Sequence, residues 1–250
     1  MNAKRPLIAV LTGAGISTDS GIPDYRGPQG LWRQDPTAQE LVTIGPYRAD
    51  PEVRRRAWRM RLETGARGAR PNAGHLALAD LERSGLPLRV LTQNVDGLHQ
   101  EAGLTARKVL ELHGNTREVQ CLRCRVVGPM AEALARVEAG EPDPACRECG
   151  GILKPRTVMF GENLDPEVLG QADSIARACD VFLAVGTSLQ VFPVAALPYA
   201  AVESGARLII LNAEATPYDE AADEVIREPI SEALPVLVRR LVRELVPDRA

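Results

Sequence analysis

Five short apolar segments recur along the chain, and small or polar residues follow each of them. The segments are branched or leucine-rich, which is typical of strands buried on both faces. They lie at residues 7–11, 88–91, 109–112, 181–185 and 207–211. Helix-like segments at residues 72–85, 165–179 and 193–205 separate several of them. Strands that alternate with helices predict an α/β fold with a parallel, doubly wound sheet.

Two further segments fall outside this alternation. Residues 31–72 are rich in Pro, Gly, Trp and Arg and predict a mainly helical insert, whereas residues 117–155 hold four cysteines and predict a small metal module. We expect these two segments to form a smaller domain beside a larger one made of residues 1–30, 73–116 and 156–250. The segment 231–245 has apolar residues at helical spacing and predicts a packing helix that ends the fold.

Composition and charge narrow the function classes. The 250 residues are 45% hydrophobic and 25% charged, as in ordinary globular proteins, and the net charge of -3 supplies no general attraction to nucleic acid. The first apolar segment has only five residues, too few for a signal core or a membrane span. We therefore expect a cytoplasmic protein without membrane or nucleic-acid contacts. The arginine-rich segment 48–70 is either a solvated helix face or a surface for acidic partners or phosphates.

The cysteines form two Cys-x-x-Cys pairs. Cys121 and Cys124 are separated by 21 residues from Cys146 and Cys149. Four thiolates presented by two turns complete a tetrahedral shell around zinc and leave no position for water, so the spacing predicts a structural zinc site. A redox dithiol would need only one pair. Cys179 precedes a buried strand and is interpreted as a core residue.

The polar residues that follow the apolar segments predict a ligand site, because the carboxyl ends of parallel strands share one edge of a sheet. Residues 11–27 read LTGAGISTDSGIPDYRG. Gly13 and Gly15 suit a dinucleotide pyrophosphate, but Thr18 replaces the third glycine of the common fingerprint. No acid ends a second strand about 20 residues on, which weakens a hydride-transfer interpretation.

The chain resembles the sirtuin family of NAD-dependent protein lysine deacylases over nearly its full length, and its arginine-rich composition suggests a bacterial source. The matching motifs are GAGIS, SGIPDYRG, TQNVDGLH, ELHGN, the four cysteines, FGE, GTSLQVFP and LNAEATPYD. The resemblance implies a Rossmann-like NAD-binding domain, a structural zinc, and transfer of an acetyl group from acetyl-lysine to ADP-ribose. Nicotinamide, O-acetyl-ADP-ribose and free lysine would be the products.

The resemblance also implies roles for individual residues. His113 corresponds to the catalytic histidine, with Asn94 and Asp96 beside it, and histidine is well suited to accept a proton near neutral pH. Tyr25 stands where the family usually has Phe. The residues implied to bind NAD are Gly13, Ala14, Gly15, Ser17, Asp24, Tyr25, Arg26, Trp32, Gln93, Asn94, Val95, Asp96, Gly186, Thr187, Ser188, Asn212, Ala213, Glu214 and Ile230. Those implied to hold the peptide as an added strand are Val158, Phe160, Gly161, Glu162 and Val191.

Several choices stay open. Family members that remove acidic acyl groups carry a Tyr-x-x-Arg pair, and a gapless count places Ala57 and Met60 at those positions, so succinyl-lysine is expected to be a poor substrate.

His75 and His99 are interpreted as structural. Protein mono-ADP-ribosyl transfer at the same NAD site is one alternative to deacetylation. A non-catalytic zinc-containing module that senses NAD or binds DNA is another.

Overall fold

The larger part of the molecule is built on a six-stranded sheet with the strand order β3-β2-β1-β7-β8-β9, parallel throughout. The computed structural model describes residues 5–24, 36–63 and 68–246. The expected α/β architecture is confirmed, and all five predicted segments are strands. The strands are β1 (Ile8–Thr12), β2 (Leu88–Thr92), β3 (Val109–Glu111), β7 (Val181–Val185), β8 (Arg207–Leu211) and β9 (Glu224–Ile226).

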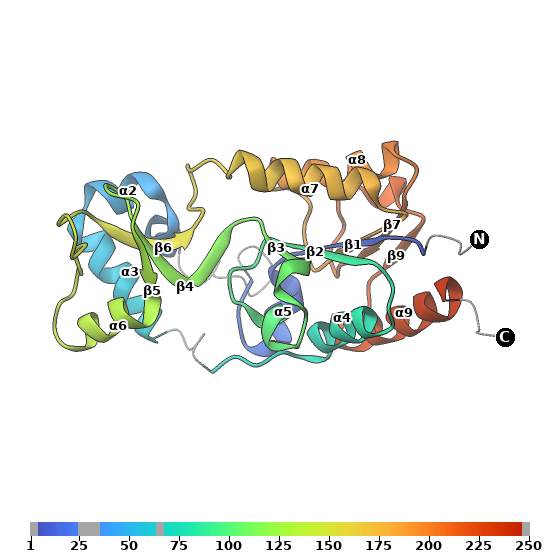
Figure 1. Cartoon of the computed structure of the whole chain (residues 1–250), viewed down its shortest axis with the longest axis horizontal. Coiled ribbons are helices and arrows are strands. Elements are labelled where there is room, and N and C mark those ends of the chain that lie inside the picture. Colours follow the sequence, from blue (N-terminus) through green and yellow to red (C-terminus); the bar gives the residue numbers. More distant parts are fainter. Residues whose placement is uncertain (1–4, 25–35, 64–67, 247–250) are drawn as a thin grey trace.

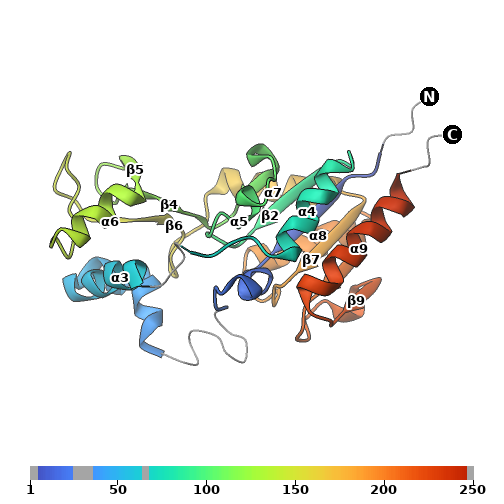
Figure 2. The ribbon, with the colours of Figure 1, turned by 90° about the horizontal axis from the view of Figure 1, so that it is seen from below.

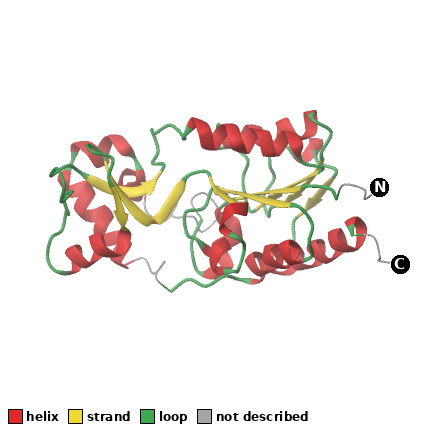
Figure 3. Cartoon of the chain, viewed as in Figure 1, coloured by secondary structure: helices red, strands yellow, loops and turns green. Residues whose placement is uncertain are grey.

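Helices cover both faces of this sheet (Figure 1, Figure 3). α4 (Ala73–Arg83) and α9 (Ile230–Leu245) pack side by side on one face, and α7 (Pro166–Ala178) and α8 (Leu197–Glu203) pack on the other. The expected apolar face of α9 is confirmed, since Leu234, Leu237, Val238 and Leu241 are buried against the sheet. Two apolar clusters, one on each face, hold the layers together.

The strand order reverses direction at β1. From β1 the chain proceeds outward through β2 and β3, and it later returns to place β7 on the other side of β1 before continuing to β8 and β9. In open parallel sheets, ligands bind at such a switch point, beyond the carboxyl ends of the strands. The first residues after β1, β2 and β7 therefore lie where a ligand site is expected.

The smaller part of the molecule contains a three-stranded antiparallel sheet at one end of the long axis (Figure 1). Its strands are β4 (Gly114–Cys121), β5 (Val127–Pro129) and β6 (Leu153–Thr157). Nearby helices are α2 (Ile44–Ala49), α3 (Pro51–Glu63) and α6 (Met130–Glu138), and the short 3-10 segment η2 (Pro36–Val42) precedes α2. Trp58 and Tyr47 are completely buried here. β4 and β6 cross the limits suggested at residues 116 and 156, so a division of domains there stays a prediction.

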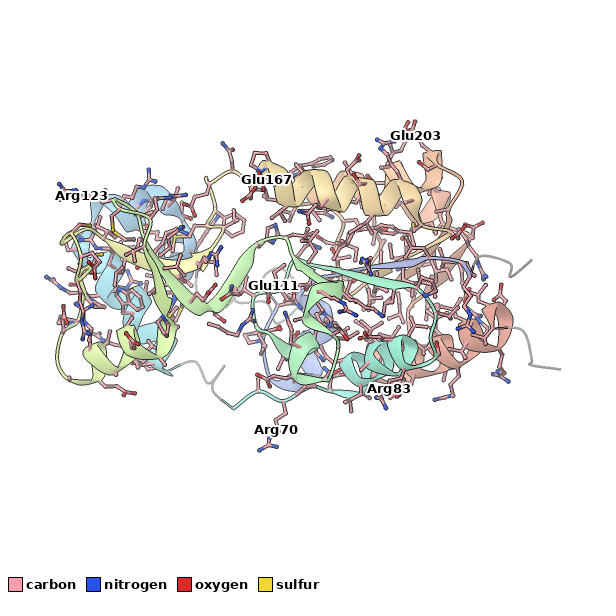
Figure 4. The ribbon with its side chains drawn as sticks, viewed as in Figure 1. Arg70, Arg83, Glu111, Arg123, Glu167 and Glu203 are labelled. Atoms are coloured by element: carbon pink, nitrogen blue, oxygen red, sulfur yellow. The ribbon has the colours of Figure 1, made fainter. Side chains whose placement is uncertain are left out.

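β4 joins the two parts (Figure 2). It begins beside the main sheet and ends at the cysteine cluster. Near its start, the Arg117 side chain bonds both carboxylate oxygens of Glu111, which is labelled in Figure 4, at 2.7 and 2.9 Å. Thr116 donates from its N–H and its hydroxyl to the carbonyl of Val95, at 3.0 and 2.8 Å. The joining strand is thus bonded to the loop that follows β2.

Candidate functional site at the carboxyl edge of the main sheet

Polar side chains from three neighbouring strand ends meet at the switch point. The amide of Asn94, after β2, donates to the carbonyl of Gly13, after β1, at 3.0 Å. The amide of Gln93 donates to the hydroxyl of Thr187, after β7, at 2.8 Å. These bonds connect β1, β2 and β7 at their carboxyl ends, so the structure brings together the strand ends that the sequence placed at one edge.

Ser17 is the centre of a small hydrogen-bond network within this edge. Its hydroxyl donates to Oδ2 of Asp96 at 2.8 Å and accepts from the amide of Asn94 at 3.1 Å. The Nε2 atom of His75 lies 3.4 Å away. Because His75 Nδ1 accepts from the N–H of Asn72 at 3.3 Å, we assign the ring proton to Nε2, which then faces the Ser17 oxygen. The Ser17 hydroxyl thus has both a donor and an acceptor within the network.

The N–H groups of the two glycines in the turn after β1 are already bonded within the protein. The N–H of Gly13 donates to the carbonyl of Val185 at 3.1 Å, and the N–H of Gly15 donates to the carbonyl of Gly186 at 2.9 Å. A Cβ on Gly13 or Gly15 would lie 2.6 or 2.8 Å from Gly186 atoms. These glycines are therefore required first for the contact between two strand ends. Among the described residues, the N–H of Ala14 has no protein acceptor.

The chain continues from this turn into a short 3-10 helix, η1 (Ala14–Ser20). Gly21 ends it with a φ of 83°, in the left-handed region that favours glycine. Asp24 is half-buried and is the last described residue before a gap. The predicted cofactor residues Tyr25, Arg26 and Trp32 lie outside the described residues, so their expected roles stay predictions.

His113 lies two residues after the end of β3 and is half-buried. Its Nδ1 atom is 3.1 Å from the carbonyl oxygen of Gln93, which can only accept, so Nδ1 carries the proton and Nε2 keeps its lone pair. Burial lowers the pKa of His113, although the bond to Gln93 raises it in part. The side chain is therefore neutral at pH 7 and able to accept a proton at Nε2.

The segment predicted to hold a peptide lies beside His113. The N–H of Val158 donates to the carbonyl of His113 at 2.8 Å. Phe160 pairs with the segment before α2, because its N–H donates to Val42 and its carbonyl accepts from Ile44, at 2.9 and 3.0 Å. Val191 is half-buried on the loop after β7.

The predicted adenosine residues follow β8. Asn212 is half-buried, while Ala213 and Glu214 are exposed. Arg227, after β9, donates from Nη1 to the carbonyls of Asn212 and Glu214, at 2.7 and 3.0 Å, and it pairs with Asp219. Sequence reasoning did not single out Arg227, because nothing in its surroundings forms a motif.

The remaining predicted NAD residues lie at the same edge. Val95 is bonded to Thr116, as described above, and Ser188 is half-buried after β7. Ile230 begins α9, and its Cγ2 atom lies 3.1 Å from the position that a Cβ on Gly74 would take. Ile230 therefore packs against the start of α4.

The four cysteines form the expected cluster. One Sγ atom from each of Cys121, Cys124, Cys146 and Cys149 lies within 4.8 Å of the others. The Cys121–Cys149 and Cys124–Cys146 sulfurs are 3.5 and 3.6 Å apart. Tetrahedral zinc with Zn–S bonds of about 2.3 Å separates its sulfurs by about 3.8 Å, so the donor set fits zinc. The thiolate of Cys121 also accepts from the N–H of Arg123 at 3.3 Å.

Three other residues have the structural surroundings that the sequence suggested. His75 and His99 are fully buried with ring centroids 5.1 Å apart, and His99 Nε2 lies 2.9 Å from the Thr12 hydroxyl. His75 nevertheless contacts Ser17, which the sequence did not indicate. The buried Cys179 thiol donates to the carbonyl of Ala176 at 3.1 Å, and burial raises its pKa to about 11, so it is a poor nucleophile.

Within the described ranges, every helix is too short or too polar to cross a lipid bilayer.

Comparison with known proteins gives one consistent result. A family model described as the Sir2 family matches residues 13–193. The NAD-dependent protein deacetylase 2 of Streptomyces coelicolor is 66% identical over 237 residues, which cover 95% of this chain and 98% of that protein. A solved Sir2 structure with a deacetylated p53 peptide and 3′-O-acetyl ADP-ribose is 36% identical, with a TM-score of 0.84 over 96% of this chain and 94% of that one. A Sir2 structure with a p53 peptide and NAD+ is also 36% identical, with a TM-score of 0.82 over the same shares.

Proposed function

The chain belongs to the Sir2 family, and on this premise we propose that the site described above makes it an NAD-dependent protein lysine deacetylase. The enzyme transfers the acetyl group from acetyl-lysine to ADP-ribose and releases nicotinamide, O-acetyl-ADP-ribose and free lysine. The observation that carries the proposal is His113, a neutral base with a free Nε2, whose Nδ1 is bonded to the carbonyl of Gln93. The next residue, Asn94, belongs to the Ser17 network.

The residues of the site have different roles in this reaction. NAD supplies the ribose carbon that receives the acyl oxygen and the nicotinamide that leaves from it. Ser17 is already bonded to both Asn94 and Asp96, so the three side chains hold their orientations without reorganisation as charge develops near them. His113 accepts a proton from a ribose hydroxyl at Nε2, while Nδ1–H stays bonded to Gln93 and fixes the ring.

The other predicted cofactor residues extend from this centre along the sheet edge. Ala14 offers its amide to the pyrophosphate, and Gly13 and Gly15 allow the close turn that presents it. Asn212 and Glu214, with backbone held by Arg227, lie on the adenosine side. Tyr25, Arg26 and Trp32 are proposed to complete the nicotinamide side.

The zinc is structural. All four ligands are thiolates from the smaller part of the molecule. A zinc ion bound by four thiolates has no position for water, so it would stabilise the fold and not activate water. Reduced zinc-binding thiols are typical of the cytoplasm, and we place the protein there. With its net charge of -3, we propose acetylated proteins and not nucleic acid as its partners.

The proposal is tested by nicotinamide release. We expect release that depends on both NAD and an acetyl-lysine peptide, together with loss of the acetyl group from the peptide. His113→Ala should abolish deacetylation while retaining wild-type zinc content and thermal stability. Labelled NAD and intact-mass analysis identify the acceptor: ADP-ribose found on the peptide or on the protein would show ADP-ribosyl transfer instead. Nicotinamide release and deacetylation that persist unchanged in His113→Ala contradict the assigned base.

A further inference from the structure

The turn after β6, at residues 159–162, is closed by two bonds between its first and last residues. The N–H of Glu162 donates to the carbonyl of Met159 at 2.9 Å. The N–H of Met159 donates to Oε2 of Glu162, also at 2.9 Å. Between them, Gly161 has a φ of 85°, in the left-handed region that favours glycine. The Glu162 carboxylate is thus bonded to the backbone of its own turn, which the sequence-based role as a peptide contact did not anticipate.

A buried lysine supports the same turn. Lys154, on β6, is only 4% exposed. Its Nζ atom is 3.0 Å from Glu162 Oε2, 3.1 Å from the Pro155 carbonyl and 2.5 Å from the Thr157 carbonyl. An ammonium group has three N–H donors, and here each has an acceptor. One buried side chain therefore holds the end of β6 and the end of the turn at a fixed separation.

Such a pair does more for geometry than for stability. Burial of two charges carries a desolvation cost that cancels much of their attraction, and apolar residues of similar volume are often equally stabilising. Burial lowers the pKa of Lys154 while Glu162 raises it, which shows the two opposing effects at this ammonium group. What the pair contributes is one defined arrangement of the turn.

The residue that precedes the turn is bonded to His113. The N–H of Val158 donates to the His113 carbonyl at 2.8 Å. The next residue, Gly114, approaches β6 so closely that a Cβ on it would lie 2.0 Å from the Arg156 carbonyl oxygen. A displacement of the turn would therefore change the position of its exposed residues relative to His113.

The outer edge of the turn has unused backbone groups. Phe160 already pairs with Val42 and Ile44. Gly161 is exposed, and among the residues that the structure describes neither its N–H nor its carbonyl has a hydrogen-bond partner. Gly161 lies in the turn and not in a strand, but its free N–H and carbonyl can form hydrogen bonds with the backbone of a bound peptide. The residues that flank the acetyl-lysine of a bound peptide would contact this edge. Their binding would therefore depend on the position of the turn.

We propose that Lys154 and Glu162 are positioning residues for protein substrates: their ion pair sets the turn at residues 159–162 so that residues flanking acetyl-lysine bind in register with His113. The inference rests on the proposed deacetylase function and deepens it. In the contacts described, both side chains bond only to β6 and to the turn, and not to His113. The pair therefore acts on the recognition of a peptide and not on the acetyl-transfer step.

The test compares two substrates that differ only in flanking residues. One is an acetyl-lysine peptide of about ten residues, and the other is a single acetyl-lysine blocked at both ends. For Lys154→Met we expect the KM of the peptide to rise about tenfold, the loss expected for one or two backbone contacts. The kcat with saturating peptide, the KM for NAD and kcat/KM for the single residue should stay within about twofold.

A matched control removes another ion pair from the smaller part of the molecule. Arg136 pairs with Glu141 at 2.6 Å, away from the turn. Arg136→Met should leave both substrates unaffected. Equal losses of both substrates in Lys154→Met would show a general structural role and overturn the inference, as would an unchanged KM for the peptide.

Glu162→Gln provides a second variant if Lys154→Met does not fold. It keeps an oxygen for the Met159 N–H but removes the charge opposite Lys154, so we expect the same peptide-selective rise in KM. Its zinc content and NAD affinity should equal those of the wild type. Failure of the proposed function is distinguishable from failure of this inference, because in that case the wild-type enzyme itself would show no NAD-dependent deacetylation of either substrate.

Discussion

The hydroxyl of Ser17 donates to the carboxylate of Asp96 at 2.8 Å, and this bond joins the turn after β1 to the loop after β2. The two residues are 79 positions apart in the chain. Asp96 also accepts from the N–H of Leu98 at 2.9 Å, which fixes the carboxylate from the other side. The site is therefore held in one arrangement by the protein itself before any ligand binds.

Removal of this hydroxyl should weaken the use of NAD. In Ser17→Ala, Asp96 loses a donor and Asn94 loses an acceptor, and each such loss costs about 1–3 kcal/mol. We expect kcat/KM for NAD to fall by about ten- to a hundredfold. Thr18→Ala is the matched control, because the exposed Thr18 hydroxyl bonds only the carbonyl of Gly15 among the contacts described. Equal rates in Ser17→Ala and Thr18→Ala would contradict the role of the network.

The pH dependence of the reaction should reflect His113. Burial lowers its pKa below the ordinary value of 6.5, so the neutral, proton-accepting form persists as the pH falls through 6.5. The acid limb of kcat/KM, which reports the free enzyme, should therefore have its midpoint below pH 6.5. Initial rates with saturating peptide and varied NAD from pH 5 to 8.5 measure it. A midpoint above 6.5 would show that His113 is stabilised as a cation in the working enzyme.

The stability of the fold should depend on His99 in acid. Burial, with the nearby His75, lowers the pKa of His99 from 6.5 to about 3. A depressed histidine pKa means that the folded state excludes a proton which the unfolded chain binds, so its contribution to stability is present above pH 6.5 and decreases below it. The loss is about 1.4 kcal/mol per pH unit until the folded pKa is reached.

Thermal unfolding of wild type and His99→Gln between pH 7.5 and 5 tests this contribution. The variant should be less stable at pH 7.5, because Thr12 loses its buried imidazole partner. Its Tm should also fall less steeply with decreasing pH. Parallel curves for the two proteins would assign the acid sensitivity to other groups, of which His75 is the nearest because burial lowers its pKa as well.

Zinc should be bound by four of the five cysteines. Titration with a thiol-specific mercurial is expected to release one zinc per chain as four thiols react. Cys179→Ala should leave this release unchanged, because Cys179 is buried away from the cluster. Cys124 is exposed, so Cys124→Ser removes a ligand without leaving a cavity in the core. We expect this variant to lose zinc, the order of the small sheet and activity together. Full zinc content in Cys124→Ser would exclude the four-thiolate site.

The main sheet was predictable because its strands are buried on both faces. β1 and β7 are buried at every position, which requires the apolar runs that sequence reasoning detects. β9 was not predicted, because it is a three-residue edge strand that begins with Glu224. An edge strand of this kind does not need a run of apolar residues. The cysteine cluster was predictable for a related reason, since its ligand spacing is local in the sequence.

The contacts that shape the site depend on pairs far apart in the chain. His75 faces Ser17 from 58 residues away, and the Arg227 side chain reaches back to the carbonyl of Asn212. The hydrogen bond from the Gly15 N–H to the Gly186 carbonyl also follows from the packing of two strand ends and not from the local motif. Periodicity and motifs place residues at an edge, but they do not say which of them bond to each other.

The choice of acyl group should follow from the apolar cluster beside the turn. Ala57 is completely buried, and it packs in this cluster with Met159, while Met60 is partly buried against it. Arg59 is exposed, and Arg61 donates to the Ala57 carbonyl at 2.6 Å and lies over the Trp58 ring. Ala57 and Met60 carry no charge, and the nearby cations are already bonded, Arg61 to the Ala57 carbonyl and Lys154 to Glu162. A succinyl carboxylate placed in this cluster would therefore lose its hydration at a cost of several kcal/mol.

We therefore expect acetyl-lysine peptides to be used at least about a hundredfold better than succinyl peptides of the same sequence, which corresponds to about 2.8 kcal/mol. Values of kcat/KM for matched peptides measure the ratio. Met60→Arg places a guanidinium beside the cluster, where it can pair with the succinyl carboxylate, and should narrow the ratio by raising succinyl turnover. Arg59→Met should not change it, because that side chain already lies on the exposed face of α3. Faster desuccinylation than deacetylation by the wild type would contradict the apolar acyl site and require a cation that contacts the acyl group.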